Sequence, residues 1–167
     1  MVPHLVWPAG GGLILELGAV LWPPPDAADA PLEPGLAPIP HAHLTLLRRR
    51  SLAGIAAAIG ADPAATLGAL PPPPPVLLCG PRRRAEAPEE DPTLGPGPRV
   101  SLFYACANQD ALHDWLAAVV AVLDARSRAA GGPAFPHPEA DRLFHVSAWN
   151  NRGGDPRRSV GGVTAPR

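Results

Sequence analysis

Two short segments, about one hundred residues apart, repeat one pattern: His43-Leu44-Thr45 and His145-Val146-Ser147. Each is a histidine, an aliphatic residue and a small hydroxyl residue within a run that is typical of a strand. Side chains of a strand alternate between its two faces. The histidine and the hydroxyl therefore share one face, and the aliphatic residues take the other. If the two strands lie side by side, two imidazoles and two hydroxyls surround one small cavity.

The alternation also assigns the neighbours of each segment to a face. Trp149 follows Ser147 by two residues, so we expect it on the histidine face, where an indole could stack on a nucleobase. Packing at a sheet edge is the alternative for this side chain. The apolar faces are expected to consist of Ala42, Leu44, Leu46, Phe144, Val146 and Ala148.

Paired imidazoles suit acid–base chemistry on a phosphodiester. Histidine titrates nearest neutral pH, so one ring can deprotonate water while the other protonates the departing oxygen. The hydroxyls of Thr45 and Ser147 would donate hydrogen bonds to the non-bridging oxygens as charge builds on phosphorus. The predicted catalytic residues are therefore His43, Thr45, His145 and Ser147, with no metal and no other cofactor.

Residues 41–47 and 143–150 resemble the two motif strands of the two-histidine (2H) phosphoesterases. This superfamily includes the bacterial RNA 2′,3′-cyclic phosphodiesterases once called 2′–5′ RNA ligases. The resemblance is confined to these two segments. It implies metal-independent hydrolysis of a phosphodiester, with an RNA end, a nucleotide or an oligonucleotide as substrate. The scissile bond would belong to a 2′,3′-cyclic phosphate, which opens to a 2′-phosphate, or to a 2′–5′-linked or cyclic oligonucleotide.

Residues flanking the motifs are candidates for substrate binding. His41 shares the face of His43, and Asn150 and Arg152 belong to a polar turn after the second motif, so we assign these three and Trp149 to substrate binding. A solvated turn is the alternative for Asn150 and Arg152. His-x-His is also a spacing of zinc ligands, and His145 would have to supply a third ligand.

Two further alternatives concern the whole site. Arg48, Arg49 and Arg50 follow the first motif and could steer an anion, although such charge runs are commonly solvated. The same cleft could also bind a cyclic or 2′–5′-linked nucleotide without cleaving it. The feature that favours this binding module is the missing helix between the first strand and the first motif, where 2H proteins usually have one.

Composition limits the class of protein. A length of 167 residues predicts one domain, and the net charge of −1 argues against a non-specific nucleic-acid binder. The longest apolar run, residues 10–22, is interrupted by Glu16 and too short to cross a bilayer. Cys79 and Cys106 are predicted to be reduced core cysteines. We expect a cytoplasmic monomer that does not bind membranes.

The order of elements predicts an α+β fold with two lobes, mostly antiparallel sheets, helices packed outside and a central cleft that carries the motifs. Residues 23–40 are expected to be a Pro-rich connector, 81–98 a mobile loop and 153–167 a frayed tail. Predicted strands cover residues 13–21, 41–47, 76–79, 99–107 and 143–150. Predicted helices cover 52–59, capped by Ser51, and 109–129, capped by Asn108, with a further turn of helix within 64–70.

Overall fold

The structure, a computed structural model, describes residues 3–7, 11–20, 22–23, 32–59, 68, 70–89, 93, 95–136 and 141–160. Four strands come first along these residues, followed by one helix, two strands, another helix, a last strand and a short 3-10 helix, η2. The elements are β1 His4–Val6, β2 Leu13–Glu16, β3 Ala37–Pro38, β4 His43–Leu47, α1 Arg49–Ile59, β5 Leu78–Ala87, β6 Arg99–Cys106, α3 Gln109–Ala129, β7 His145–Asn150 and η2 Pro156–Arg158.

All seven strands belong to one sheet with the order β1-β2-β4-β7-β6-β5, and β3 pairs with the far end of β7. Every strand pair in the described part of the sheet is antiparallel. The predicted α+β class is thereby confirmed. The strands form one continuous sheet, and a division into two lobes does not follow from this order. The two motif strands, β4 and β7, are neighbours in the middle of the sheet.

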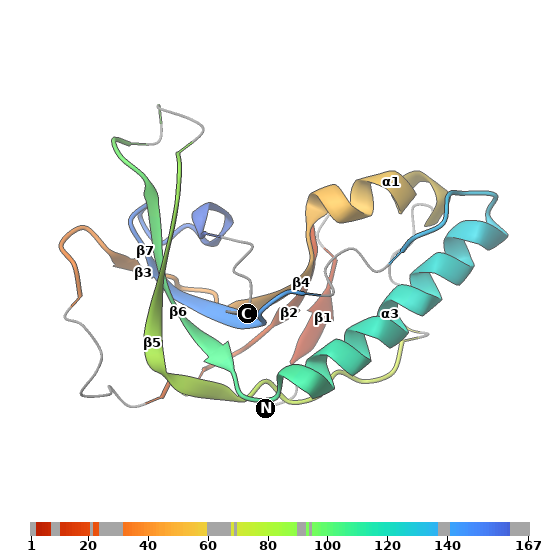
Figure 1. Cartoon of the computed structure of the whole chain (residues 1–167), viewed down its shortest axis with the longest axis horizontal. Coiled ribbons are helices and arrows are strands. Elements are labelled where there is room, and N and C mark those ends of the chain that lie inside the picture. The colour runs from red at the N-terminus through yellow and green to blue at the C-terminus, as the bar shows by residue number, and fades with distance from the viewer. Residues whose placement is uncertain are drawn as a thin grey trace.

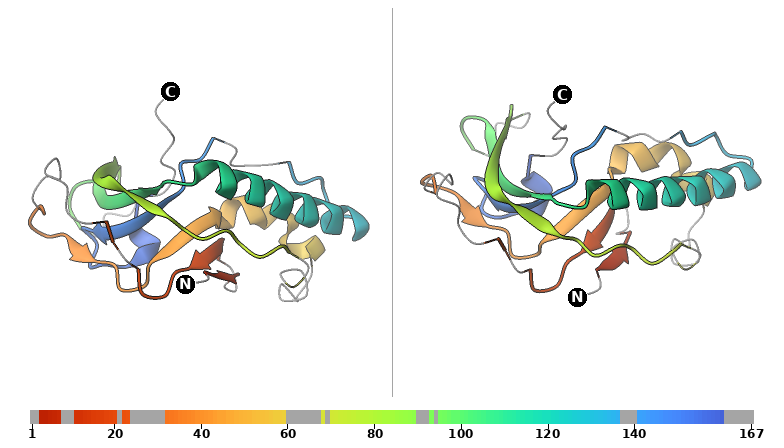
Figure 2. Two further views of the ribbon diagram at one scale, coloured as in Figure 1. Left: turned by 90° about the horizontal axis from the view of Figure 1, so that it is seen from below. Right: turned by 60° about the horizontal axis from the view of Figure 1, so that its bottom comes forward.

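The helices α1 and α3 pack on one face of β4 and β7. The main core joins Leu44 of β4 and Val146 of β7 to apolar residues of the two helices. Figure 1 shows α1 and α3 side by side at one end of the molecule, whereas β5 and β6 curve away at the other end; Figure 2 shows the same arrangement from two further directions. The helical residues in this core are Leu52, Ile55, Leu112, Trp115, Leu116, Val119, Val120 and Leu123.

The other face of β4 and β7 bears no helix within the described residues. A second, small cluster lies on that side and contains Phe103, Ala105 and Leu143. The predicted apolar faces are confirmed for Leu44, Leu46, Phe144 and Val146, which belong to the main core, and for Ala42, which packs against it. Ala148 is buried but belongs to neither cluster.

Each motif strand has a β-bulge three residues after its histidine. In the β2–β4 pair, Ile14 faces Thr45 but Leu13 faces Leu47, so Leu46 is the extra residue of β4. A bulge shifts the alternation by one position. Leu46 and Leu47 can therefore both enter the main core, and neither is exposed. In the β6–β7 pair, Phe103 faces Ser147 but Leu102 faces Trp149, so Ala148 is the extra residue of β7.

The expected loop over residues 81–98 is wrong for its first part, because residues 81–87 belong to β5. This strand pairs with β6 on one side only, as the last strand of the sheet. An edge strand bears charged side chains at its exposed positions, and for this reason its sequence is typical of a loop. Within the described part of the expected loop, residues 88–89 and 95–98 lie outside helices and strands.

The first part of the expected frayed tail, residues 153–160, packs on the sheet, where Val160 donates its N–H to Ser101 Oγ at 2.8 Å. The rest of that tail, 161–167, lies outside the described residues. The strands β1 and β3 were not predicted, and β3 lies within the expected connector 23–40. Most of the predicted helical turn at 64–70 and part of this connector lie outside the described residues. No helix of the described residues is long and apolar enough to cross a membrane.

Candidate functional site

The register of β4 and β7 brings the four predicted catalytic residues together. Leu44 is the antiparallel partner of Val146. Because this pair is antiparallel, His43 lies toward Ser147 and Thr45 toward His145. These four residues alternate with the core residues Leu44 and Val146, so they share the opposite face. Two imidazoles and two hydroxyls therefore occupy adjacent positions on the face of these strands that bears no helix in the described part of the chain.

The two histidines are held in the same way by the backbone of their own segments. Nδ1 of His43 lies 3.3 Å from the carbonyl oxygen of His41, and Nδ1 of His145 lies 2.9 Å from that of Leu143. A carbonyl oxygen only accepts hydrogen bonds, so each neutral ring carries its proton on Nδ1. Nε2 is then left with a lone pair, as a general base requires.

His145 is the more deeply buried of the two histidines, with 8% of its surface exposed. Its ring lies 4.7 Å from the ring of Phe103. The pKa of His145 is lowered to about 4, mainly by burial and also by the positive charges of Arg142 and Arg48, whereas the hydrogen bond to Leu143 acts in the opposite direction. The free protein therefore holds His145 neutral at physiological pH.

His43 is half-buried, and its pKa is also lowered, mainly by burial. Two charges act on it in opposite directions: Glu16 raises the pKa of His43 and Arg142 lowers it. The motif pattern did not indicate either residue. Glu16 faces His43 across the β2–β4 pair, and a contact of this kind follows from strand pairing rather than from local sequence.

Arg142 places a cation next to both imidazoles. It is buried, with 8% of its surface exposed, and its Nη1 donates to the carbonyl oxygen of Leu46 at 3.4 Å. Its charge lowers the pKa of both His43 and His145. Arg48, which we considered for anion steering, also acts on His145. The sequence signal that could have indicated Arg142 is its position three residues before the second motif histidine.

Thr45 and Ser147 are half-buried. No hydrogen bond of either hydroxyl is found among the described residues, so both are available to donate to a ligand on this face. His41 is exposed, and its contact within the site is the backbone oxygen that faces His43. Among the described residues, no group of three or more His, Cys, Asp or Glu side chains is placed to hold a metal ion.

The expectation that Trp149 shares the histidine face is wrong. The bulge at Ala148 pairs Trp149 with Leu102, on the face opposite to Ser147 and Phe103. The Trp149 ring there lies 6.2 Å from Trp22, which packs against the main core. The Arg82 guanidinium lies 5.4 Å from the centre of the same indole. Stacking of Trp149 on a base held between the histidines is therefore not supported.

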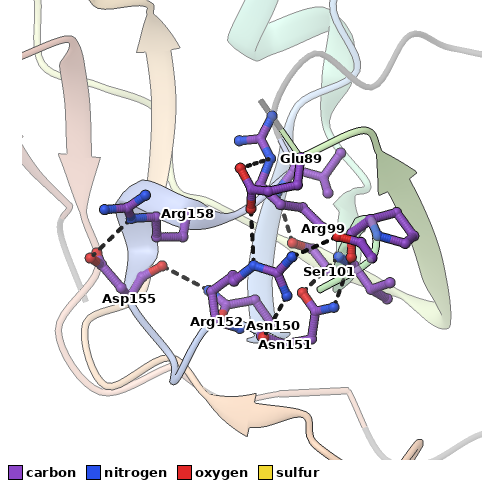
Figure 3. A network of polar contacts seen from close by, with 12 residues as sticks. Glu89, Arg99, Ser101, Asn150, Asn151, Arg152, Asp155 and Arg158 are labelled. Carbon is purple, nitrogen blue, oxygen red and sulfur yellow. Dashed lines mark hydrogen bonds and ion pairs between the residues drawn. The ribbon is translucent and has the colours of Figure 1, made fainter. Parts of the chain in front are cut away.

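The side chains of Asn150 and Arg152 are engaged in the turn after β7, which Figure 3 shows. Asn150 is fully buried; its Oδ1 accepts the N–H groups of Arg152 and Gly154. The Arg152 side chain is 7% exposed, and its Nε lies 3.0 Å from Glu89 Oε2. Its Nη2 donates to the carbonyl oxygen of Gly97. These contacts use the polar atoms that we expected to meet a substrate.

Comparisons with protein-family models, with curated proteins and with solved structures found no match to this chain.

Proposed function

We propose that the protein is a metal-independent phosphodiesterase that uses His43 and His145 as a general acid–base pair. Its substrate class would be the one that the resemblance to 2H phosphoesterases implies: 2′,3′-cyclic phosphates on RNA ends or nucleotides, or 2′–5′-linked or cyclic oligonucleotides. The proposal includes a substrate cleft between two lobes, as in that superfamily. The observation that carries it is the register of Leu44 with Val146, which aligns the two motifs side by side.

Each group has a defined task in the proposed reaction. One Nε2 accepts a proton from water as the water oxygen bonds to phosphorus. The other histidine gives a proton to the ribose oxygen whose bond to phosphorus breaks. The hydroxyls of Thr45 and Ser147 donate to the non-bridging oxygens, where negative charge increases in the transition state. The cationic side chains of Arg142 and Arg48 favour an anion at this place.

A bound phosphodiester also changes the histidines. In the free protein the pKa values of both His43 and His145 are lowered, so both rings are mostly neutral near pH 7. An anion close to an imidazole favours its charged form and raises its pKa. A bound phosphodiester therefore favours protonation of one ring, and that ring then holds the proton that the leaving oxygen requires.

A panel of substrates tests the proposal. Purified protein is incubated with 2′,3′-cyclic nucleotides, RNA with a 2′,3′-cyclic end, 2′–5′-linked dinucleotides and cyclic dinucleotides, each with and without EDTA. We expect hydrolysis of at least one of them at the same rate in EDTA, and a 2′-phosphate from any 2′,3′-cyclic substrate. Hydrolysis that stops in EDTA, or no product from any substrate, contradicts the proposal.

The lowered pKa of both histidines also favours a second candidate, a module that binds such a nucleotide without cleaving it. A pair of neutral rings can accept hydrogen bonds from a ligand and has no proton ready to give to a leaving group. Equilibrium binding on the same panel separates the two functions. Tight binding with no product after long incubation supports the module, whereas turnover excludes it.

A further inference from the structure

The two histidines of the site have different charged neighbours. Glu16 on β2 is the direct cross-strand partner of His43 on β4, so the carboxylate and the imidazole share the face that bears the site. His145 has no such neighbour: the charged side chains that act on it within the described residues are Arg142, Arg48 and His43. The pair is therefore symmetric in its backbone contacts and asymmetric in its electrostatics.

The other groups around His43 do not remove this asymmetry. Arg142 acts on both histidines and so lowers the pKa of each. The nearby part of β7 contributes the neutral hydroxyl of Ser147, and His4 on β1 faces Glu16 from its far side. The titratable and charged groups next to His43 are thus Glu16 from β2, Arg142 from the segment before β7, His145 from β7 and His41 from its own segment.

We propose that Glu16 is a positioning residue that makes His43 the proton-carrying member of the pair, so that His43 is the general acid and His145 the general base. The inference rests on the proposed function. His145 is buried against Phe103 and lies near the positive charges of Arg142 and Arg48. It therefore keeps its Nε2 lone pair and takes a proton from water. The water oxygen bonds to phosphorus, and the bond from phosphorus to the ribose 3′ oxygen breaks. That oxygen takes the proton from Nε2 of His43. The two rings then exchange their protons with solvent.

Titration of the histidine ring signals by NMR tests the inference in the folded protein without any substrate. The His43 signals are assigned by their loss in His43→Ala. In Glu16→Gln, we expect proton binding by His43 to weaken by about two- to five-fold at low ionic strength, the range of an exposed charge pair. The His145 titration should move less. Glu16→Asp should restore part of the effect, and Glu86→Gln, which removes an exposed carboxylate from β5, should leave both titrations unchanged.

The pH dependence of kcat gives the second readout. If His43 is the acid, Glu16→Gln should move the basic limb of the kcat profile to lower pH and leave KM near the wild-type value. An unchanged His43 titration in Glu16→Gln overturns the inference, even when the protein hydrolyses its substrate. An acidic limb that moves instead of the basic limb overturns the assignment of His43 as acid. A shifted titration in a protein that hydrolyses nothing overturns the proposed function and leaves only the electrostatic coupling.

Discussion

At the scale of single residues, local sequence indicates the histidines and hydroxyls of the site but not the charged side chains next to them. His43, Thr45, His145 and Ser147 could be predicted because strand alternation is a local rule and two tripeptides of the same pattern share it. Glu16 could not, because its place beside His43 depends on the pairing of β2 with β4. Arg142 was not predicted either, although it lies three residues before the second motif histidine. The deep burial of His145, which lowers its pKa to about 4, also depends on how the strands and loops pack around it.

This burial makes a prediction about stability. The unfolded chain takes up a proton on His145 near pH 6.5, whereas the folded protein takes it up only near pH 4. The unfolded state therefore binds more protons between these values, so the free energy of unfolding should fall as the pH decreases from about 6.5 to about 4. The loss from His145 should approach about 3 kcal/mol below pH 4 and be absent above pH 7.

Urea unfolding at pH 4 to 8 measures this contribution, with His145→Leu as the comparison. The variant should lose most of the slope between pH 6.5 and pH 4, and His43, whose pKa is lowered in the same direction, should account for part of the remainder. An equal slope in the wild type and in His145→Leu would show that His145 titrates normally in the folded protein.

At the scale of elements, the helices and strands whose pattern depends on nearby residues could be predicted, and features that depend on a distant partner strand could not. The helix α3, Gln109–Ala129, was predicted with both of its ends, because its apolar period is a local signal. Asn108 occupies the N-cap position as predicted, but its side chain makes no capping hydrogen bond: it accepts from Leu77 N–H and donates to the Pro75 carbonyl. The helix α1 begins at Arg49, so Ser51 lies inside its first turn rather than before it. The bulges and the edge strand β5 depend on partner strands, and sequence alone did not indicate them.

The bulge of β7 leads to a contrast between two neighbouring positions. Ser147→Ala removes a donor from the histidine face, so kcat should fall by about 10² to 10³, the usual effect of one such hydrogen bond in the transition state. Trp149→Leu removes an aromatic ring from the opposite face, where it contacts Trp22. Here kcat and KM should stay near the wild type, while the free energy of unfolding falls by about 1–3 kcal/mol.

Steady-state kinetics together with urea unfolding check both variants on one substrate. A large rise of KM in Trp149→Leu with unchanged stability would mean that Trp149 contacts the substrate. Strand alternation without a bulge predicts that contact. Equal kinetic effects of the two variants would mean that the bulge does not separate the faces.

At the scale of the whole molecule, the strand order gives the two motifs their common place. The strands β4 and β7 are about one hundred residues apart in the sequence and adjacent in the middle of one antiparallel sheet. Both helices cover one face of these strands, and the motif residues occupy the other. The α+β class could be predicted from the order of elements. The single continuous sheet could not, because it depends on how β4 and β7 meet.

The central claim is that His43 and His145 act together on one phosphodiester, and the most direct test is kcat of their single alanine variants. Each variant is compared with the wild type on the substrate that the panel identifies, with His113→Ala as a control that removes an imidazole from α3, outside the site. We predict that His43→Ala and His145→Ala each lower kcat by about 10² to 10⁴, the usual contribution of one general acid or base, while His113→Ala stays near the wild type. Wild-type kcat in both site variants would contradict the account.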